Sequence, residues 1–216
     1  MKIAAAIKPT LFVLGLLPLA YYVIGFFADR LGANPIETLT RGFGTWALDF
    51  LLLSLAVTPL RKLSGWNIVI RWRRMLGLYC FFYASLHLSA YLWLDQFFDW
   101  SAIANDILKR PFITIGMVSF LLLLPLALSS NNFSLRKLGG KRWQALHRSV
   151  YAIGPLVTLH YAWMVKADLG KPLIYAALLA MLLGLRLLWF IRSLLARPAR
   201  RAPTRKDSPS PSRTML

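Results

Sequence analysis

Long, nearly uncharged apolar runs decide what this sequence can fold into. A helix that crosses about 30 Å of hydrocarbon needs roughly 20 apolar residues. Six runs approach this length, and they are Thr10 to Ala28, Phe43 to Leu60, Met75 to Leu94, Phe112 to Ser129, Val150 to Val165 and Pro172 to Ile191. Hydrophobic residues make up 57% of the 216 residues, far more than a soluble core of this size needs. The sequence therefore predicts an all-α, multi-pass membrane protein with six transmembrane helices.

Basic residues gather in alternate loops of this predicted bundle. Five lie from Arg61 to Arg74, five from Arg136 to Arg148 and seven from Arg192 onward, whereas the intervening loops carry most of the acidic residues. By the positive-inside rule, both termini are expected on the cytoplasmic side. The net charge of +18 is then explained by topology and by contact with anionic membrane lipid, and a nucleic-acid partner is not expected.

The apolar runs divide the chain into three parts. We expect residues 1–9 to form a cytoplasmic N-terminus and residues 10–192 to form the six-helix domain. Residues 193–216 are rich in Pro, Ser and Arg and are predicted to be a disordered basic cytoplasmic tail. The lone Cys80 excludes a disulfide within one chain and also a cysteine-rich metal or iron–sulfur site.

Two of the three histidines lie inside apolar runs, at matching depths. His87 is thirteen residues past Arg74 in the third run, and His160 is twelve residues past Arg148 in the fifth. Both runs are predicted to cross from inside to outside, so the two imidazoles lie at one level in the outer half of the bilayer. Such a pair can ligate both axial positions of a haem iron. The alternative is that each histidine forms an ordinary interhelical hydrogen bond, but the matched depth favours haem.

A second pair of residues lies at the inner level. Arg73 precedes His87 by fourteen residues, which is about 21 Å of helix and leaves the two only about 40° apart around the axis. His147 precedes His160 by thirteen residues and would be about 140° out of phase on one ideal helix. Either a kink at Pro155 or a position of His147 beyond the regular helix would resolve this difference.

Other ionisable residues near the predicted spans are candidates for cofactor contacts. The propionates of a buried haem need cationic partners, and the candidates are Arg41 at the outer end of the second span and Arg73, Arg74 and Arg148 at the inner end. Arg186 lies within the sixth span and is a further candidate, while Asp49 in the second span is suited to a proton or quinone site. For each of them, a simple interfacial position is the alternative.

These features resemble a known family. The six spans, a third helix with a pair of positions fourteen apart and a fifth with histidines thirteen apart resemble the ferric reductase-like transmembrane domain shared with NADPH oxidases. The stretches RRMLGLYCFFYASLH and KRWQALHRSVY, together with the short length, are more specifically similar to the MsrQ family of haem-binding membrane subunits. The resemblance covers roughly residues 10 to 192. It departs from the ferric reductases in having Arg73 in place of a histidine and in lacking a flavin and nicotinamide domain.

The resemblance implies a function. It implies one haem b held by His87 and His160. It leaves open a second haem at His147 and Arg73, and it includes FMN as a further cofactor. Electrons would pass from the quinone pool or a cytosolic flavin reductase to the periplasmic molybdopterin subunit MsrP, which reduces methionine sulfoxide in oxidised periplasmic proteins. The chain would be an electron-transfer subunit of the bacterial inner membrane without its own methionine-sulfoxide reductase site. A quinol-oxidising b-type cytochrome of another family and a small proton-coupled transporter are the alternatives.

Overall fold

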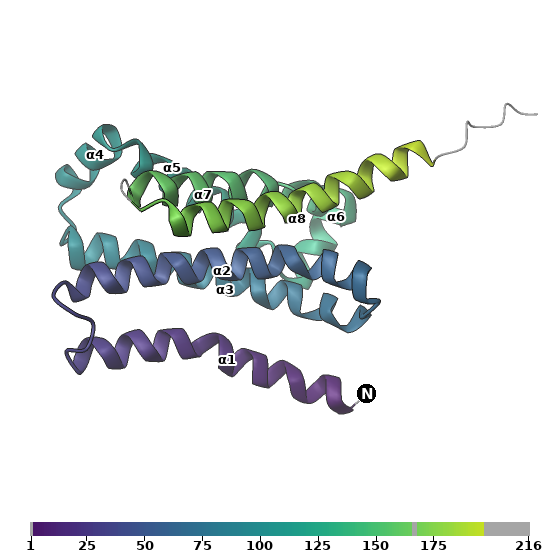
Figure 1. Ribbon diagram of the computed structural model, residues 1–216, viewed down its shortest axis with the longest axis horizontal. Helices are drawn as coiled ribbons and strands as arrows, with labels where there is room; N and C mark the ends of the chain where they lie inside the picture. The colour runs from purple at the N-terminus through teal and green to yellow at the C-terminus, as the bar shows by residue number, and fades with distance from the viewer. Residues whose placement is uncertain (1, 166–167, 197–216) are drawn as a thin grey trace, which may run out of the picture.

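The computed structural model describes residues 2–165 and 168–196, so residues 197–216 of the predicted tail lie outside the described residues. The described chain forms ten helical segments (Figure 1). They are α1 (Lys2–Phe27), α2 (Pro35–Ser64), a 3₁₀ helix (Asn67–Trp72), α3 (Arg73–Ser89), a π-helical segment (Ala90–Asp95), α4 (Trp100–Lys109), α5 (Pro111–Leu128), α6 (Asn132–His147), α7 (Val150–Val165) and α8 (Gly170–Leu195). The predicted all-α membrane fold is confirmed.

The long helices run roughly parallel and antiparallel to one another in a single bundle. Figure 1 shows α2 and α3 side by side in the middle, with α1 on one side of them and α5, α7 and α8 on the other. The short helix α4 lies at one end of the bundle and α6 lies at the other. The first turn of α1 and the last described turn of α8 are at the same end. This is the arrangement expected if both termini are on one side of a membrane.

Five described segments are long and apolar enough to cross a bilayer, judged by length and composition. They are 8–27 in α1, Pro35–Ser64, Asn67–Asp95, Pro111–Leu128 and Gly170–Leu195. Helix α7, which corresponds to the predicted fifth span, has 16 residues and packs between α5 and α8. Leu17, Leu121 and Leu187 are more than half exposed on the outside of the bundle, as lipid-facing side chains are.

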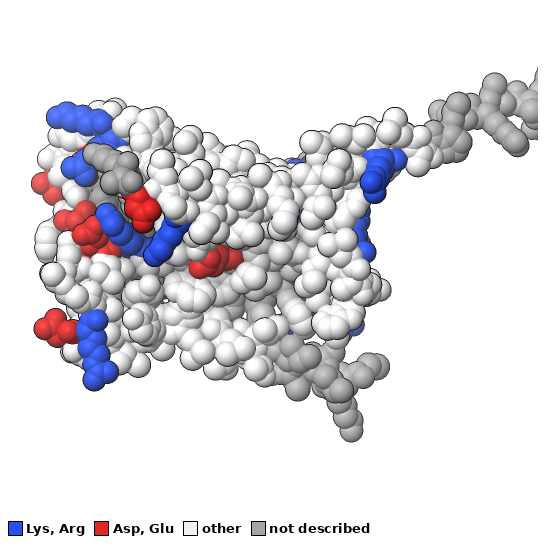
Figure 2. Space-filling model, viewed as in Figure 1, with Lys and Arg blue, Asp and Glu red and all other residues white. Residues whose placement is uncertain are grey.

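Charge is separated along the bundle. Figure 2 shows a broad belt that is uncharged except for one small acidic patch, with acidic and basic side chains gathered at the end where α4 lies and basic side chains at the opposite end. Helix α4 begins at the exposed N-cap Asp99, which accepts hydrogen bonds from the backbone nitrogens of Ser101 and Ala102. Hydrogen bonds from Ala102 and Ser101 lower the pKa of Asp99, so this cap is charged at neutral pH.

A tyrosine on α3 holds α1 in place. The Tyr83 side chain is completely buried, and its hydroxyl donates to the Gly15 carbonyl at 2.7 Å and accepts from the Leu19 backbone nitrogen at 3.1 Å. Gly15 and Leu19 are one helical turn apart. The hydroxyl therefore binds both the acceptor and the donor of one turn and joins α1 to α3.

Replacing Tyr83 with phenylalanine is expected to loosen α1 without changing the volume of the core. The change removes the two hydrogen bonds that join α3 to the Gly15 carbonyl and the Leu19 N–H, and a typical hydrogen bond contributes about 0.5–1.5 kcal/mol net. We expect a lower thermal midpoint in detergent and faster proteolysis between α1 and α2. Tyr21→Phe is the matched control, because Tyr21 is 67% exposed. Equal stability of both variants would contradict the bridging role.

Candidate cofactor site

An apolar cavity of about 270 Å³ lies among α2, α3, α5 and α7. Leu48, Leu51, Ala84, Leu123 and Ile153 are among the side chains that form its walls. Both membrane histidines line it as well, His87 from α3 and His160 from α7. A mostly apolar cavity with a few converging polar groups is the usual form of a cofactor site.

The imidazole of His87 is fixed by helix α2. Its Nδ1 lies 2.8 Å from the Thr40 carbonyl oxygen, to which it donates a hydrogen bond. One turn further along α2 is Gly44, where an added Cβ atom would lie 3.0 Å from His87 Nδ1. The absence of a side chain at Gly44 therefore lets the ring approach the backbone of α2.

The imidazole of His160 is fixed by helix α5 in the same way. Its Nδ1 lies 2.7 Å from the Phe112 carbonyl oxygen and donates to it. Gly116 follows Phe112 by one turn, and a Cβ atom there would lie 2.9 Å from His160 Nδ1. Each histidine thus has one ring nitrogen bound to a backbone carbonyl of a neighbouring helix. Neither Nε2 has a hydrogen-bond partner among residues 2–165 and 168–196.

The two rings are spaced as the axial ligands of one metal ion would be. Their centroids are 6.1 Å apart and their planes are inclined at 79°. Two imidazoles on opposite sides of a metal ion have centroids about 6.2 Å apart, because a metal–nitrogen bond is about 2.0 Å long and the centroid lies about 1.1 Å behind the nitrogen. The pair therefore fits the two axial positions of a haem iron, with the second nitrogen of each ring oriented by a carbonyl as metal-bound histidines usually are.

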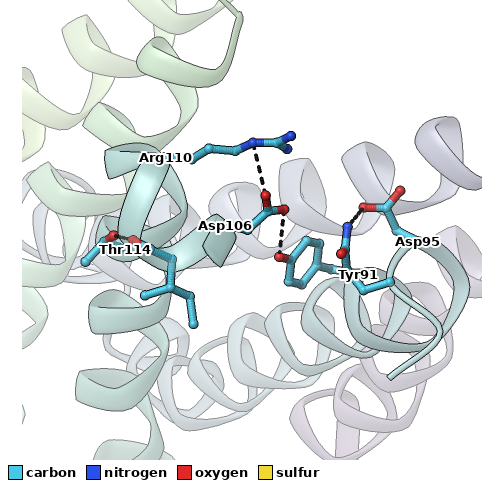
Figure 3. Close-up of polar contacts among 7 residues, drawn as sticks. Tyr91, Asp95, Asp106, Arg110 and Thr114 are labelled. Carbon is cyan, nitrogen blue, oxygen red and sulfur yellow. Dashed lines mark hydrogen bonds and ion pairs between the residues drawn. The ribbon is translucent and has the colours of Figure 1, made fainter. Parts of the chain in front are cut away.

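Two arginines line the cavity on the side nearest the α4 end of the bundle. Arg41 of α2 and Arg110, between α4 and α5, both line the cavity. Arg41 forms an ion pair with Glu37 at 2.5 Å, and Arg110 Nε lies 3.2 Å from Asp106. Figure 3 shows that Asp106 also accepts a hydrogen bond from the Tyr91 hydroxyl, at 3.2 Å. These cationic groups are suited to the two propionates of a porphyrin.

Comparison with known proteins places the chain in a family. It matches the family described as ferric reductase like transmembrane component over residues 43–158, which is more than half of its length. The chain is 60% identical over 189 residues to a protein-methionine-sulfoxide reductase heme-binding subunit MsrQ of Azospira oryzae, covering 87% of this chain and 81% of that protein. It belongs to the MsrQ family. The protein of the same name from Rhodospirillum rubrum is 55% identical, covering 89% of this chain and 91% of that protein. The one from Herminiimonas arsenicoxydans is 52% identical, covering 85% of this chain and 85% of that protein.

The inner pair predicted from the sequence lies apart from this cavity in this member of the MsrQ family. Arg73 is the first residue of α3, and His147 is the last residue of α6. The His147 ring stacks on Trp143 with centroids 3.8 Å apart, and its Nε2 lies 3.1 Å from the Ser129 hydroxyl. Burial and then the positive charges of Arg73 and Arg74 lower the pKa of His147, so its imidazole is neutral at pH 7.

The phase difference between His147 and His160 has a simple explanation. The two residues are on different helices, because α6 ends at His147 and α7 begins at Val150. An azimuth counted along one ideal helix therefore does not apply to this MsrQ chain. His147 therefore lies beyond the regular helix that carries His160, and Pro155 lies within that helix, α7.

The other ionisable residues singled out in the sequence have partners in the protein. Asp49 accepts a hydrogen bond from the Tyr175 hydroxyl at 2.8 Å. Arg186 donates to the Tyr151 hydroxyl at 2.9 Å and to the Leu55 carbonyl. None of Asp49, Arg186, Arg73, Arg74 and Arg148 lines the cavity, whereas Arg41 does.

Sequence reasoning missed three functional candidates in this MsrQ chain. They are Arg110, Gly44 and Gly116. A signal for Arg110 exists, because it lies two residues before Phe112, at the start of a predicted span, much as Arg41 lies two residues before Phe43. The two glycines carry no such signal, because their role depends on which side chain approaches them from another helix.

Proposed function

We propose that this protein is a membrane haem b subunit that transfers electrons to a periplasmic methionine-sulfoxide reductase. The observation that carries the proposal is the spacing of His87 and His160, whose rings are 6.1 Å apart in one cavity and are each anchored through Nδ1. The name of the relatives, heme-binding subunit of protein-methionine-sulfoxide reductase, supports it. Bound haem supplies a one-electron couple inside an otherwise insulating layer.

The chain's own residues hold and insulate this couple. His87 and His160 are the proposed axial ligands, and Arg41 and Arg110 are the proposed propionate partners. The apolar walls exclude water from the ring, and this exclusion helps to set the reduction potential. Arg41 and Arg110 line the cavity toward the end that carries α4, which we assign to the periplasm on the basis of the charge separation. That end of the cavity is the proposed point of electron exit toward MsrP. The proposed location of the chain is the bacterial inner membrane.

The other cofactor and donor assignments are also proposals. The quinone pool or a cytosolic flavin reductase is the proposed electron donor, and FMN is a proposed additional cofactor, both because of the family. A second haem would use His147, with Arg73 nearby. For that, the His147 ring has to leave its hydrogen bond with Ser129, so we propose one haem per chain.

An optical spectrum of the purified full-length protein tests the proposed function. We expect a low-spin b-type spectrum and one haem per chain by pyridine haemochrome assay, with iron and flavin quantified in the same preparation. Two haems per chain would overturn the stoichiometry and point to His147. A colourless, iron-free preparation that still delivers electrons to its catalytic partner would overturn the function.

Arg110→Gln tests the proposed propionate contact. A hydrogen bond that involves a charged group is worth roughly 1.5–3 kcal/mol, so we expect about a tenfold or larger rise in the haem dissociation constant. The measurement is a titration of haem-depleted protein with hemin in detergent. Lys109→Gln is the matched control. It removes the same charge from the neighbouring position, and Lys109 does not line the cavity. Equal affinities of the two variants would remove Arg110 from the site.

A further inference from the structure

The two membrane histidines are held by matching pairs of residues on different helices. Thr40 and Gly44 are four residues apart on α2, and Phe112 and Gly116 are four residues apart on α5. Four residues are about one helical turn, so in each pair the carbonyl and the glycine lie on the same face of the helix. We call each pair a carbonyl–glycine clamp, because the carbonyl binds Nδ1 of one histidine and the glycine makes room for its ring.

The lack of a side chain matters at these two glycines, whereas two other helical glycines have open space beside them. A Cβ atom at Gly44 or Gly116 would lie 3.0 Å or 2.9 Å from a histidine nitrogen, which is closer than carbon and nitrogen atoms normally approach without bonding. By contrast, a Cβ atom at Gly77 of α3 or Gly184 of α8 would have no neighbour within 4 Å. Any side chain at the two clamp positions must therefore move the imidazole or the helix.

The clamps fix how each ring is turned as well as where it lies. A hydrogen bond from Nδ1 restrains rotation of an imidazole about the bond between Nε2 and its metal. Because the two carbonyls belong to different helices, α2 and α5, each ring is oriented independently of the other. The result is an angle of 79° between the two ring planes, close to perpendicular.

We propose that the two carbonyl–glycine clamps hold the axial imidazoles in crossed planes and thereby set the electronic state of the haem iron. An imidazole interacts by π donation with the iron d orbital that lies perpendicular to its plane. When the two ring planes are crossed, each ring interacts with a different d orbital, so the two orbitals have nearly equal energies. When the planes are parallel, both rings interact with the same d orbital, and the two orbitals differ in energy. This proposal rests on haem ligation by His87 and His160, and it makes Gly44 and Gly116 positioning residues for those ligands.

Electron paramagnetic resonance of the oxidised protein at low temperature tests the orientation directly. Crossed imidazoles predict a highly anisotropic low-spin signal with a single prominent feature at low field. Recording the spectrum on the His147→Ala variant as well excludes a contribution from a second haem. A three-line rhombic low-spin spectrum, typical of parallel imidazoles, would overturn this inference and leave the proposed function intact. Absence of low-spin iron would instead overturn the proposed function.

Alanine at the clamp glycines tests their part in the orientation. In Gly44→Ala and Gly116→Ala we expect the low-field feature to shift and broaden and the midpoint potential to change. Gly77→Ala and Gly184→Ala are matched controls, with the same added methyl group in open space, and both should keep the wild-type spectrum. Wild-type spectra and potentials in the two clamp variants would overturn the proposal. If a clamp variant does not accumulate as folded protein, the spectrum of the unaltered chain decides.

Discussion

Replacing either His87 or His160 with alanine is expected to abolish the low-spin b-type spectrum. Each histidine supplies one of two axial bonds, and the sequence offers one further histidine, His147, which lies at the other end of the bundle on α6. Haem content per chain should fall by most of its wild-type value in each variant, measured by pyridine haemochrome assay against protein concentration. Retention of full low-spin haem in both variants would refute the ligand assignment.

Two further variants serve as controls for this result. Arg73→Ala should leave most of the spectrum unchanged, because Arg73 does not line the cavity. His147→Ala distinguishes one haem from two, since an unchanged spectrum is expected for one and loss of about half of the haem for two. His147 stacks on Trp143 and contacts Ser129, so its removal should affect the inner end of the bundle and not the cavity.

Filling the cavity is expected to exclude haem while both histidines remain. Ala84 is on α3, one turn before His87, and it lines the cavity. An indole at this position occupies the space between the helices, so Ala84→Trp should reduce bound haem tenfold or more. Overpacking of a well-packed site also costs typically 1–3 kcal/mol, so folding has to be checked by size-exclusion chromatography in detergent.

Ala177→Trp is the matched control for this substitution. Ala177 is exposed on α8 and does not line the cavity, so the added indole should face lipid and leave haem content unchanged. If Ala84→Trp binds haem as well as Ala177→Trp does, the porphyrin lies elsewhere, whatever the histidine variants show.

The length of the apolar runs was enough to predict the membrane spans. It was not enough to predict the residues at which the helices begin and end. Helix α2 begins at Pro35, eight residues before the predicted span, because Asn34 caps it and its first turns are polar. The helix after Arg73 continues past Ser89 as a π-helical segment to Asp95. Helices α4 and α6 were not predicted, since neither has an apolar run long enough to stand out. Short amphipathic helices at the ends of a bundle are fixed by contacts that one sequence does not reveal.

The candidate site was predictable in part. Counting residues from the basic ends of two spans placed His87 and His160 at one depth, and their rings do lie together; their role as ligands stays a prediction. The position of His147 on a separate helix was left open, because the turn at Arg148 and Ser149 contains neither glycine nor proline. The clamps were not predictable, since which glycine a histidine approaches is decided by tertiary packing.

The hydroxyl of Tyr83 has a consequence for the biogenesis of the protein. Its partner Leu19 precedes it by 64 residues, so α1 is synthesised and enters the membrane well before the side chain that binds it. In a nascent chain that has inserted α1 and α2 alone, the turn from Gly15 to Leu19 therefore lacks its bond to α3. Lateral docking of α3 supplies that bond, so insertion of the third helix is expected to precede the final placement of the first.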